Sequence, residues 1–219
     1  MKFKKVWCIC LLAWSVWLLS AACAETTYDA LCEKAKLDPA NVAAWIEIDG
    51  ASISQPVMQH PNDDAYYSSH DPHGNEIEGG ALYTQASYNN KEFSDPVTII
   101  YGSSTKEGMV LRNLQEIYSG KFDACREIKL HLPDETLEYE VFAAVPYAAT
   151  HILHYNDFNM ERRFTGFFDS VFGQRVLGMH LMKEDRPEFG DRVIILSTGL
   201  RGDKLQRYLV MAKLVTNKI

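Results

Sequence analysis

The stretch DRVIILSTGLRGDKLQRYLVMAKLV, residues 191–215, decides the fold of this chain. It contains a short β-branched apolar run, Val193–Leu196, and a second apolar run, Tyr208–Val215. The residues between the two runs are mostly polar and include Gly and Asp. Apolar runs bounded by such turn residues are typical of β-strands, so the segment predicts two neighbouring strands joined by a polar loop.

The residues at the end of the first strand carry a family resemblance. The Leu-Ser-Thr at 196–198, together with Arg207 and the run that follows it to Leu214, resembles the last two core strands of a sortase. In that family the residue after Ser-Thr is the nucleophilic cysteine, and the arginine that opens the next strand steadies the reacting carbonyl oxygen. Here Arg207 fills the arginine position, whereas Gly199 stands at the cysteine position.

The third catalytic position of the family is changed as well. Sortases have a strand that ends in Tyr-Gly-His, in which the His is the general acid and base. This chain has Val-Thr-Ile-Ile-Tyr-Gly at 97–102, followed by Ser103. A serine has no group that titrates near neutral pH, so Ser103 cannot take the role of that His. The resemblance therefore implies a sortase-like protein in which two of the three reacting groups are replaced.

The rest of the chain resembles class B sortases in particular. The motifs that carry this resemblance are AWIEIDG at 44–50, ISQPVMQ at 53–59, YY at 66–67, SHD at 69–71 and GGALY at 79–83. A helix inserted before the penultimate core strand separates class B from the shorter classes. The resemblance implies a mainly β fold, a sortase-type closed β-barrel with N-terminal helices and that inserted helix.

Hydrophobic periodicity predicts the positions of most elements. The predicted helices cover 26–36, the residues from Asp38-Pro39 to Ala44, 106–117 and 156–174. The last of these has an apolar stripe made of Met160, Phe164, Phe167, Phe168, Val171 and Phe172. The predicted strands cover 45–48, 53–58, 125–132, 137–147 and 192–197, and a charged loop is predicted over 183–191.

Residues 1–24 are predicted to be a targeting segment, which leaves residues 25–219 as one sortase-like domain. Three lysines precede an apolar run over 6–22. Three fates remain open, namely cleavage after Ala24, lipidation at Cys23, or retention as a membrane anchor. Because positive charge keeps the N-terminus inside, each fate places the domain beyond the extracellular face of the cytoplasmic membrane, either attached to it or secreted.

Charge excludes one class of partner. The whole chain carries a net charge of −7, and without residues 1–24 it has 19 basic and 29 acidic residues. Such a surface repels phosphate backbones, so no nucleic-acid partner is predicted. The apolar fraction of 47% argues for a globular domain. Its two cysteines, Cys32 and Cys125, are predicted to be buried apolar residues, with an extracellular disulfide as the alternative.

No metal or other cofactor is predicted. The histidines near other potential ligands are His60, His70, His73, His151 and His154. Their spacings match no metal-ligand signature, so polar loops are the preferred interpretation.

The candidate site residues are therefore Ser103, Gly199 and Arg207. Arg207 retains a guanidinium that can hold a carbonyl or a carboxylate at two points. Tyr101 and the residues at 197–198, Ser197 and Thr198, are predicted to line a groove for an extended peptide.

Three functions remain open. The first is a pseudo-sortase that binds a sorting-signal-like peptide or a cell-surface protein without cutting it. The second is an active transpeptidase, for cell-wall protein anchoring or pilus assembly, that uses non-standard residues such as Ser103 or Ser197; an unactivated hydroxyl is a poor nucleophile. The third is a structural scaffold. An ion pair between Arg207 and Asp203 is the alternative role for the arginine.

Overall fold

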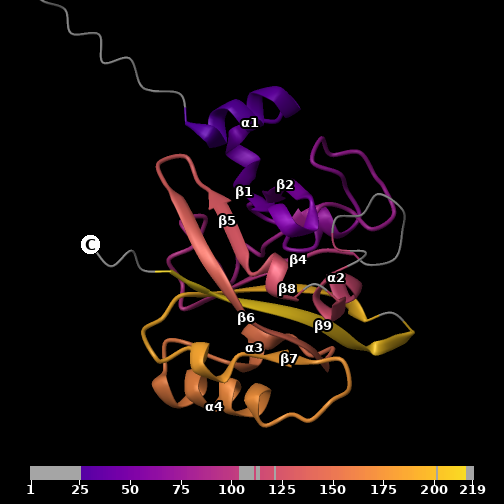
Figure 1. Ribbon diagram of the computed structural model, residues 1–219. Coiled ribbons are helices and arrows are strands. Elements are labelled where there is room, and N and C mark those ends of the chain that lie inside the picture. Colours follow the sequence, from indigo (N-terminus) through magenta and orange to yellow (C-terminus); the bar gives the residue numbers. More distant parts are fainter. Residues whose placement is uncertain (1–25, 104–110, 112–113, 121, 201, 216–219) are drawn as a thin grey trace, which may run out of the picture.

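The computed structural model describes residues 26–103, 111, 114–120, 122–200 and 202–215 (Figure 1). In this part of the chain nine strands form one sheet, in the order β5-β1-β2-β3-β4-β8-β9-β6-β7. Because β5 also pairs with β6, the first eight strands of this order close into a barrel and β7 lies outside the closure. The strands are β1 (Val42–Ile48), β2 (Ile53–Met58), β3 (Leu82–Tyr83), β4 (Val97–Tyr101), β5 (Glu127–His131), β6 (Thr136–Ala148), β7 (His180–Leu181), β8 (Val193–Leu200) and β9 (Asp203–Leu214). The predicted mainly β, closed-barrel fold is confirmed.

The strand that decides the fold is buried on both faces. Ile194 and Leu196 of β8 belong to the core inside the barrel, whereas Val193 and Ile195 belong to a second core outside it. Successive side chains of a strand point to opposite faces, so a strand covered on both sides must be apolar at every position. This is why 193–196 is a continuous apolar run rather than an alternating one.

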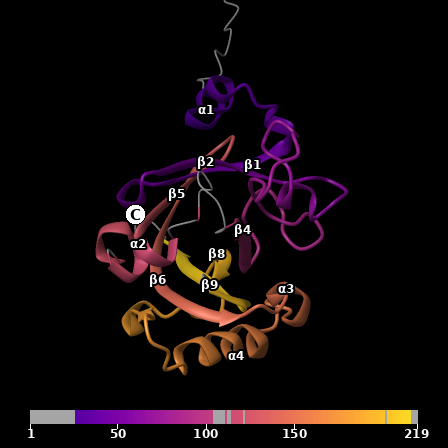
Figure 2. The same cartoon turned by 90° about the vertical axis from the view of Figure 1, so that its right-hand side faces the viewer.

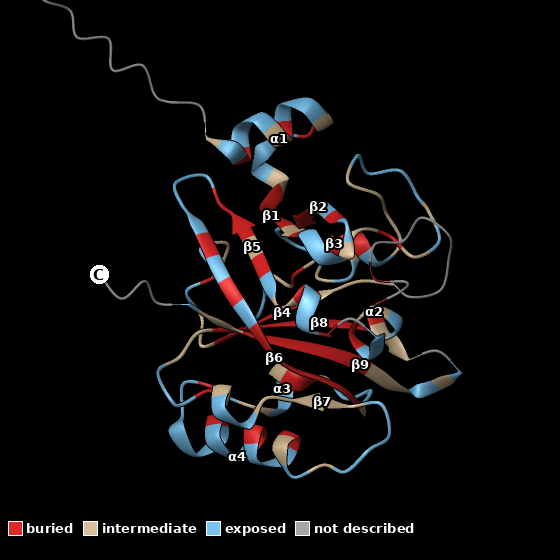
Figure 3. Ribbon diagram, in the orientation of Figure 1, coloured by how far each residue is buried: buried red, intermediate tan, exposed pale blue. Residues whose placement is uncertain are grey.

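Helices cover the barrel from opposite sides (Figures 1 and 2). The helix α1 (Thr27–Ala35) lies beyond β1, and Thr26 caps it by accepting the Asp29 N–H at 3.2 Å. The helices α3 (Ile152–Tyr155) and α4 (Glu161–Phe172) lie against β6 and β9. One side of α4 is buried and the other is exposed (Figure 3).

The buried side of α4 consists of four residues of the predicted stripe, Phe164, Phe167, Phe168 and Val171. It packs on Phe142 and Met211 in the core outside the barrel. The inserted helix before the penultimate core strand is therefore confirmed, although it begins at Glu161 rather than Asn156. The preceding residues form α3 and a turn in which Asp157 Oδ1 accepts the Asn159 N–H at 3.1 Å.

The predicted boundary between the second helix and the first strand is wrong. The predicted helix from Asp38 to Ala44 is only a 3₁₀ turn over Pro39–Asn41, and β1 begins at Val42. Asp38 does cap that turn, accepting the Ala40 N–H at 2.9 Å. The strand begins earlier because Val42 pairs with Met58 and Ala44 with Val57, and this pairing buries both residues. Tertiary pairing has here overridden the local helix signal.

The loop between the last two strands is much shorter than predicted. Strand β8 continues to Leu200 and β9 begins at Asp203, with Gly202 at a φ of +86° in the turn. The residues 197–207 therefore belong largely to paired strands. The predicted charged loop over 183–191 contains a 3₁₀ turn over Lys183–Asp185, and β7 was not predicted.

The other elements match their predictions or lie partly outside the described residues. The hairpin β5–β6 is confirmed, with the Leu132 N–H donating to the Glu135 carbonyl at 2.8 Å across its turn. The helix α2 (Leu114–Gly120) overlaps the end of the predicted helix over 106–117, most of which lies outside the described residues. Cys32 and Cys125 are buried and not joined by a disulfide, as preferred.

The predicted targeting segment, residues 1–24, lies outside the described residues. Within the part of the chain that the structure describes, no helix has the length and apolar character needed to cross a bilayer.

Candidate functional site

The three framing positions lie at the same end of neighbouring strands. Strands β4 and β8 are parallel, with Tyr101 opposite Ser197, and the Gly102 N–H donates to the Ser197 carbonyl at 3.0 Å. Ser103 lies two residues after Tyr101, and Gly199 lies two residues after Ser197. The parallel register therefore places Ser103 at the level of Gly199. On the other side of β8, Gly199 is the direct partner of Arg207 on β9. The fold thus brings the predicted positions 103, 199 and 207 together.

The glycine before Ser103 is required by packing. A Cβ built on Gly102 would lie 2.6 Å from Leu82 Cδ2 and 2.7 Å from Leu111 Cδ1, closer than carbon atoms approach. A side chain at position 102 would therefore require Leu82 and Leu111 to shift.

Two of the predicted groove residues are not exposed. Ser197 and Thr198 each expose 1% of their surface. Thr198 is the partner of Tyr208, which is part of the core inside the barrel, so its side chain points inward. Burial argues against direct contact of these two side chains with a peptide, whereas Tyr101 is half-buried at the edge of the core outside the barrel.

Arg207 lies half-buried between a glycine and a tyrosine. Its neighbours across the sheet are Gly199 on β8 and Tyr147 on β6. The alternative ion pair with Asp203 is not formed, because Asp203 Oδ1 accepts the Leu205 N–H at 2.8 Å and its Oδ2 accepts the side-chain amide of Gln206 at 2.9 Å. Among the described residues, Arg207 has no ion-pair partner.

Two tyrosines share the electrostatic environment of Arg207. The rings of Tyr83 and Tyr101 stack, with centroids 5.4 Å apart. Burial raises the pKa of both phenols above the usual value, and the Arg207 guanidinium acts on both in the opposite direction. Both hydroxyls are therefore neutral near neutral pH and available as hydrogen-bond donors. Sequence reasoning did not connect Tyr83 with the site, because it lies on a different strand, β3.

A depression adjoins this site. It has a volume of about 450 Å³ and starts at Tyr147, the cross-strand neighbour of Arg207. It continues along α4, where Phe167 lines it together with Arg162 and Arg163. The depression therefore begins one strand away from Arg207 and carries additional positive charge. Nothing in the alternation of β6 distinguished Tyr147 in the sequence.

Two of the three positions that the family resemblance marks as reactive carry other residues, Ser103 and Gly199. Gly199 has no side-chain atom with which to attack a carbonyl, and Ser103 has a hydroxyl where an imidazole would be needed to move a proton. Arg207 supplies a guanidinium whose charge acts on two neutral phenols, and all three groups can donate hydrogen bonds to an oxygen-rich group.

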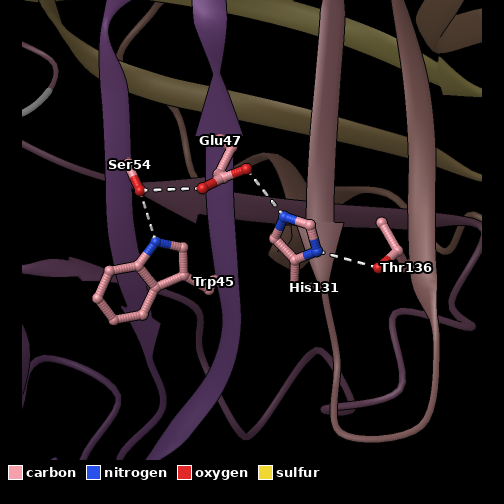
Figure 4. A network of polar contacts seen from close by, with 5 residues as sticks. All are labelled: Trp45, Glu47, Ser54, His131 and Thr136. Atoms are coloured by element: carbon pink, nitrogen blue, oxygen red, sulfur yellow. Dashed lines mark hydrogen bonds and ion pairs between the residues drawn. The ribbon is translucent and has the colours of Figure 1, made fainter. Parts of the chain in front are cut away.

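A separate polar network lies on the barrel wall (Figure 4). His131 Nε2 lies 3.0 Å from Glu47 Oε2, and His131 Nδ1 lies 3.0 Å from Thr136 Oγ1. The Ser54 hydroxyl donates to Glu47 Oε1 at 3.2 Å and accepts the Trp45 indole N–H at 2.9 Å. These residues come from β1, β2, β5 and β6, the strands around the closure of the barrel. The network therefore fixes β5 to its two neighbours, β1 and β6.

The other histidines belong to polar loops and aromatic contacts. The Tyr66 ring is stacked between His60, at 4.5 Å, and His70, at 4.0 Å. Likewise, His151 packs on Tyr88 with ring centroids 4.7 Å apart. Within the described ranges, no group of three or more His, Cys, Asp or Glu side chains is arranged to hold a metal ion.

Comparison with known proteins agrees with this fold. No family model matches the chain. Sortase B of Listeria monocytogenes serovar 1/2a is 26% identical over 181 residues, covering 80% of this chain and 70% of that protein.

Comparison with solved structures also finds sortases. The structure of sortase B from Listeria monocytogenes is 25% identical, with a TM-score of 0.66, covering 84% of this chain and 99% of that one. A Staphylococcus aureus sortase B–substrate complex is 19% identical, with a TM-score of 0.69, covering 87% of this chain and 85% of the other. The closed barrel is thus a sortase fold. Within that fold, the inserted α4 and the sortase B relatives make the chain similar to class B sortases in particular.

Proposed function

We propose that this protein is a catalytically inactive class B sortase-like protein that binds a peptide of a cell-surface protein without cleaving it. The observation that carries the proposal is the set of residues at the end of β4, β8 and β9. Gly199 and Ser103 stand where the resemblance places a thiol and an imidazole, while Arg207 is kept beside them. A covalent mechanism without its nucleophile and its proton carrier loses on the order of 10⁴–10⁶ in rate.

The retained parts favour a binding role. Arg207 has no ion-pair partner among the described residues, and a depression begins at Tyr147, its cross-strand neighbour, and continues along α4. One solved structure with this fold is a Staphylococcus aureus sortase B–substrate complex, which supports a substrate-like ligand for this chain. Because Arg207 forms no ion pair within the part of the chain that the structure describes, its charge can be matched by a ligand.

We further propose that the domain acts at the extracellular face of the cytoplasmic membrane. The support is the sequence of residues 1–24, with its three lysines and its apolar run over 6–22. Anchoring, lipidation at Cys23 and secretion after cleavage all agree with this position. Mass spectrometry of the protein from its own host distinguishes the three forms.

The test is incubation of the purified protein with fluorescent sorting-signal peptides, beside an active class B sortase as the positive control. The proposal expects saturable binding and intact peptide. Cleavage by the unaltered protein would refute it and support a transpeptidase that uses non-standard residues. Absence of any binding would instead favour a scaffold.

A gain-of-function experiment tests the same site from the other direction. The double variant Gly199→Cys with Ser103→His restores the thiol and the imidazole beside Arg207. We expect it to cleave sorting-signal peptides slowly, whereas the matched double variant Gly199→Ala with Ser103→Ala should not. If the restored variant folds with unchanged thermal stability and stays inert, the peptide-binding surface is not the one that the family uses.

A further inference from the structure

We propose that the Arg207 site binds the free C-terminal carboxylate of a peptide rather than a peptide bond within a chain. The proposal rests on the proposed function and specifies which part of the peptide the site recognises. Its basis is the combination of a guanidinium that forms no ion pair among the described residues, two stacked phenols on which its charge acts, and a glycine as its cross-strand partner.

The first step concerns charge. Arg207 is half-buried, and no carboxylate among the described residues forms an ion pair with it. The carboxylate closest to it along β9, that of Asp203, accepts hydrogen bonds from Leu205 and Gln206. A ligand that brings a full negative charge compensates the guanidinium, whereas the carbonyl of a peptide bond brings only a dipole.

The second step concerns shape. A guanidinium presents parallel N–H groups that match the two oxygens of a carboxylate, and a peptide carbonyl offers only one oxygen. Gly199, the direct cross-strand partner of Arg207, has no side chain on the face that the two residues share. At position 199 itself, therefore, no side chain lies beside the guanidinium.

The third step concerns the tyrosines. Tyr83 and Tyr101 are half-buried, stacked and within the field of Arg207. Because burial raises the pKa of both, they stay protonated. A neutral phenol donates a hydrogen bond to a carboxylate, whereas a phenolate would repel it. The pair therefore reinforces the preference of the guanidinium for an anion.

One group opposes the ligand. The carboxylate of Asp64 acts on both Tyr83 and Tyr101, so it lies within electrostatic range of the same space. Its Oδ1 accepts the Ser87 N–H at 3.1 Å, which holds it on its own loop. Its negative charge should weaken the binding of an anion. Removing that charge should therefore strengthen binding, whereas removing the charge of Arg207 should weaken it.

The experiment compares three peptides of one sorting-signal sequence by fluorescence anisotropy with the full-length protein. The first ends at a chosen residue with a free carboxylate, the second ends at the same residue with a carboxamide, and the third continues for two residues beyond it. We expect the carboxylate peptide to bind about tenfold or more tightly than the other two at moderate salt. The advantage should disappear in Arg207→Gln and persist in part in Arg207→Lys.

Two controls complete the design. Lys204→Gln removes an exposed positive charge from the same strand and should leave the tenfold preference unchanged. Asp64→Asn should increase the preference two- to threefold. Circular dichroism and melting temperature establish that each variant is folded.

The outcomes separate this inference from the proposed function. If all three peptides bind with equal affinity, the carboxylate inference is wrong and the proposed function stands. If the preference survives in Arg207→Gln, the carboxylate is bound elsewhere and the inference is also wrong. If no peptide binds, the proposed function and the inference fail together.

Discussion

Removing the imidazole of His131 should loosen the closure of the barrel. This side chain lies on β5, the strand that pairs with both β1 and β6. It contacts Glu47 on β1 and Thr136 on β6, each at 3.0 Å, and its side chain is 9% exposed. In His131→Leu both contacts are lost, and Glu47 keeps only the hydroxyl of Ser54 as a partner from this network.

The size of the effect follows from these contacts. A hydrogen bond to a charged group contributes about 1.5–3 kcal/mol, and one between neutral groups contributes about 1 kcal/mol. The Glu47 side chain is 30% exposed, so water regains part of its interactions when His131 is removed. Leucine also buries apolar surface in place of the imidazole. We therefore expect a loss of about 2 kcal/mol in the free energy of unfolding, and a melting temperature lower by about 4–8 °C for a domain of this size.

Chemical denaturation at neutral pH measures this loss, with His73→Leu as the matched control because His73 is exposed on a loop. A double-mutant cycle with Glu47→Gln tests the contact itself. If Glu47 acts through His131, the double variant should be about as unstable as His131→Leu alone. A change below about 0.5 kcal/mol in His131→Leu, or full additivity with Glu47→Gln, would show that the network does not hold the closing strand.

Three further predictions concern stability. Phe168→Ala, at a fully buried position of α4, should lower the free energy of unfolding by about 3–5 kcal/mol, whereas Leu177→Ala, which is 99% exposed, should change it by less than about 0.5 kcal/mol. Gly50→Ala places a Cβ against the carbonyl oxygen of Ala124 and should cost about 1–3 kcal/mol, while Gly120→Ala, with nothing within 4 Å, should be neutral or slightly stabilising in the same denaturation assay. Burial raises the pKa of several tyrosines, so their folded pKa lies above their unfolded pKa of about 10. Their stabilising contribution is then complete below about pH 10 and is lost as the pH rises, by about 1.4 kcal/mol per pH unit for each tyrosine. The tyrosines concerned include Tyr28, Tyr101, Tyr118 and Tyr139. Denaturation at rising pH measures this slope. Tyr139→Phe should reduce the slope by the contribution of one tyrosine. A slope of zero would contradict the burial argument.

The sequence by itself determined which residues stand at positions 103 and 199 and predicted most of the strands. Gly199 and Ser103 are identities, and no folding can give a glycine a thiol or a serine an imidazole. The run Val193–Leu196 and the hairpin around Pro133 were predictable because hydrophobic pattern and turn chemistry act over a few neighbouring residues. The same local signals misjudged the residues from Asp38 to Ala44, where pairing with β2 decides the structure.

Only the tertiary structure decided which residues meet. It aligned β4 with β8 so that positions 103 and 199 share one end of the barrel, and it placed Tyr83 against Tyr101 beside Arg207. It left Arg207 without Asp203, because the tight turn directs that carboxylate to its own strand. It also joined β1, β5 and β6 through His131. Such contacts link residues far apart in the chain, and their free energy comes from burial and register across the whole barrel, which no local pattern encodes.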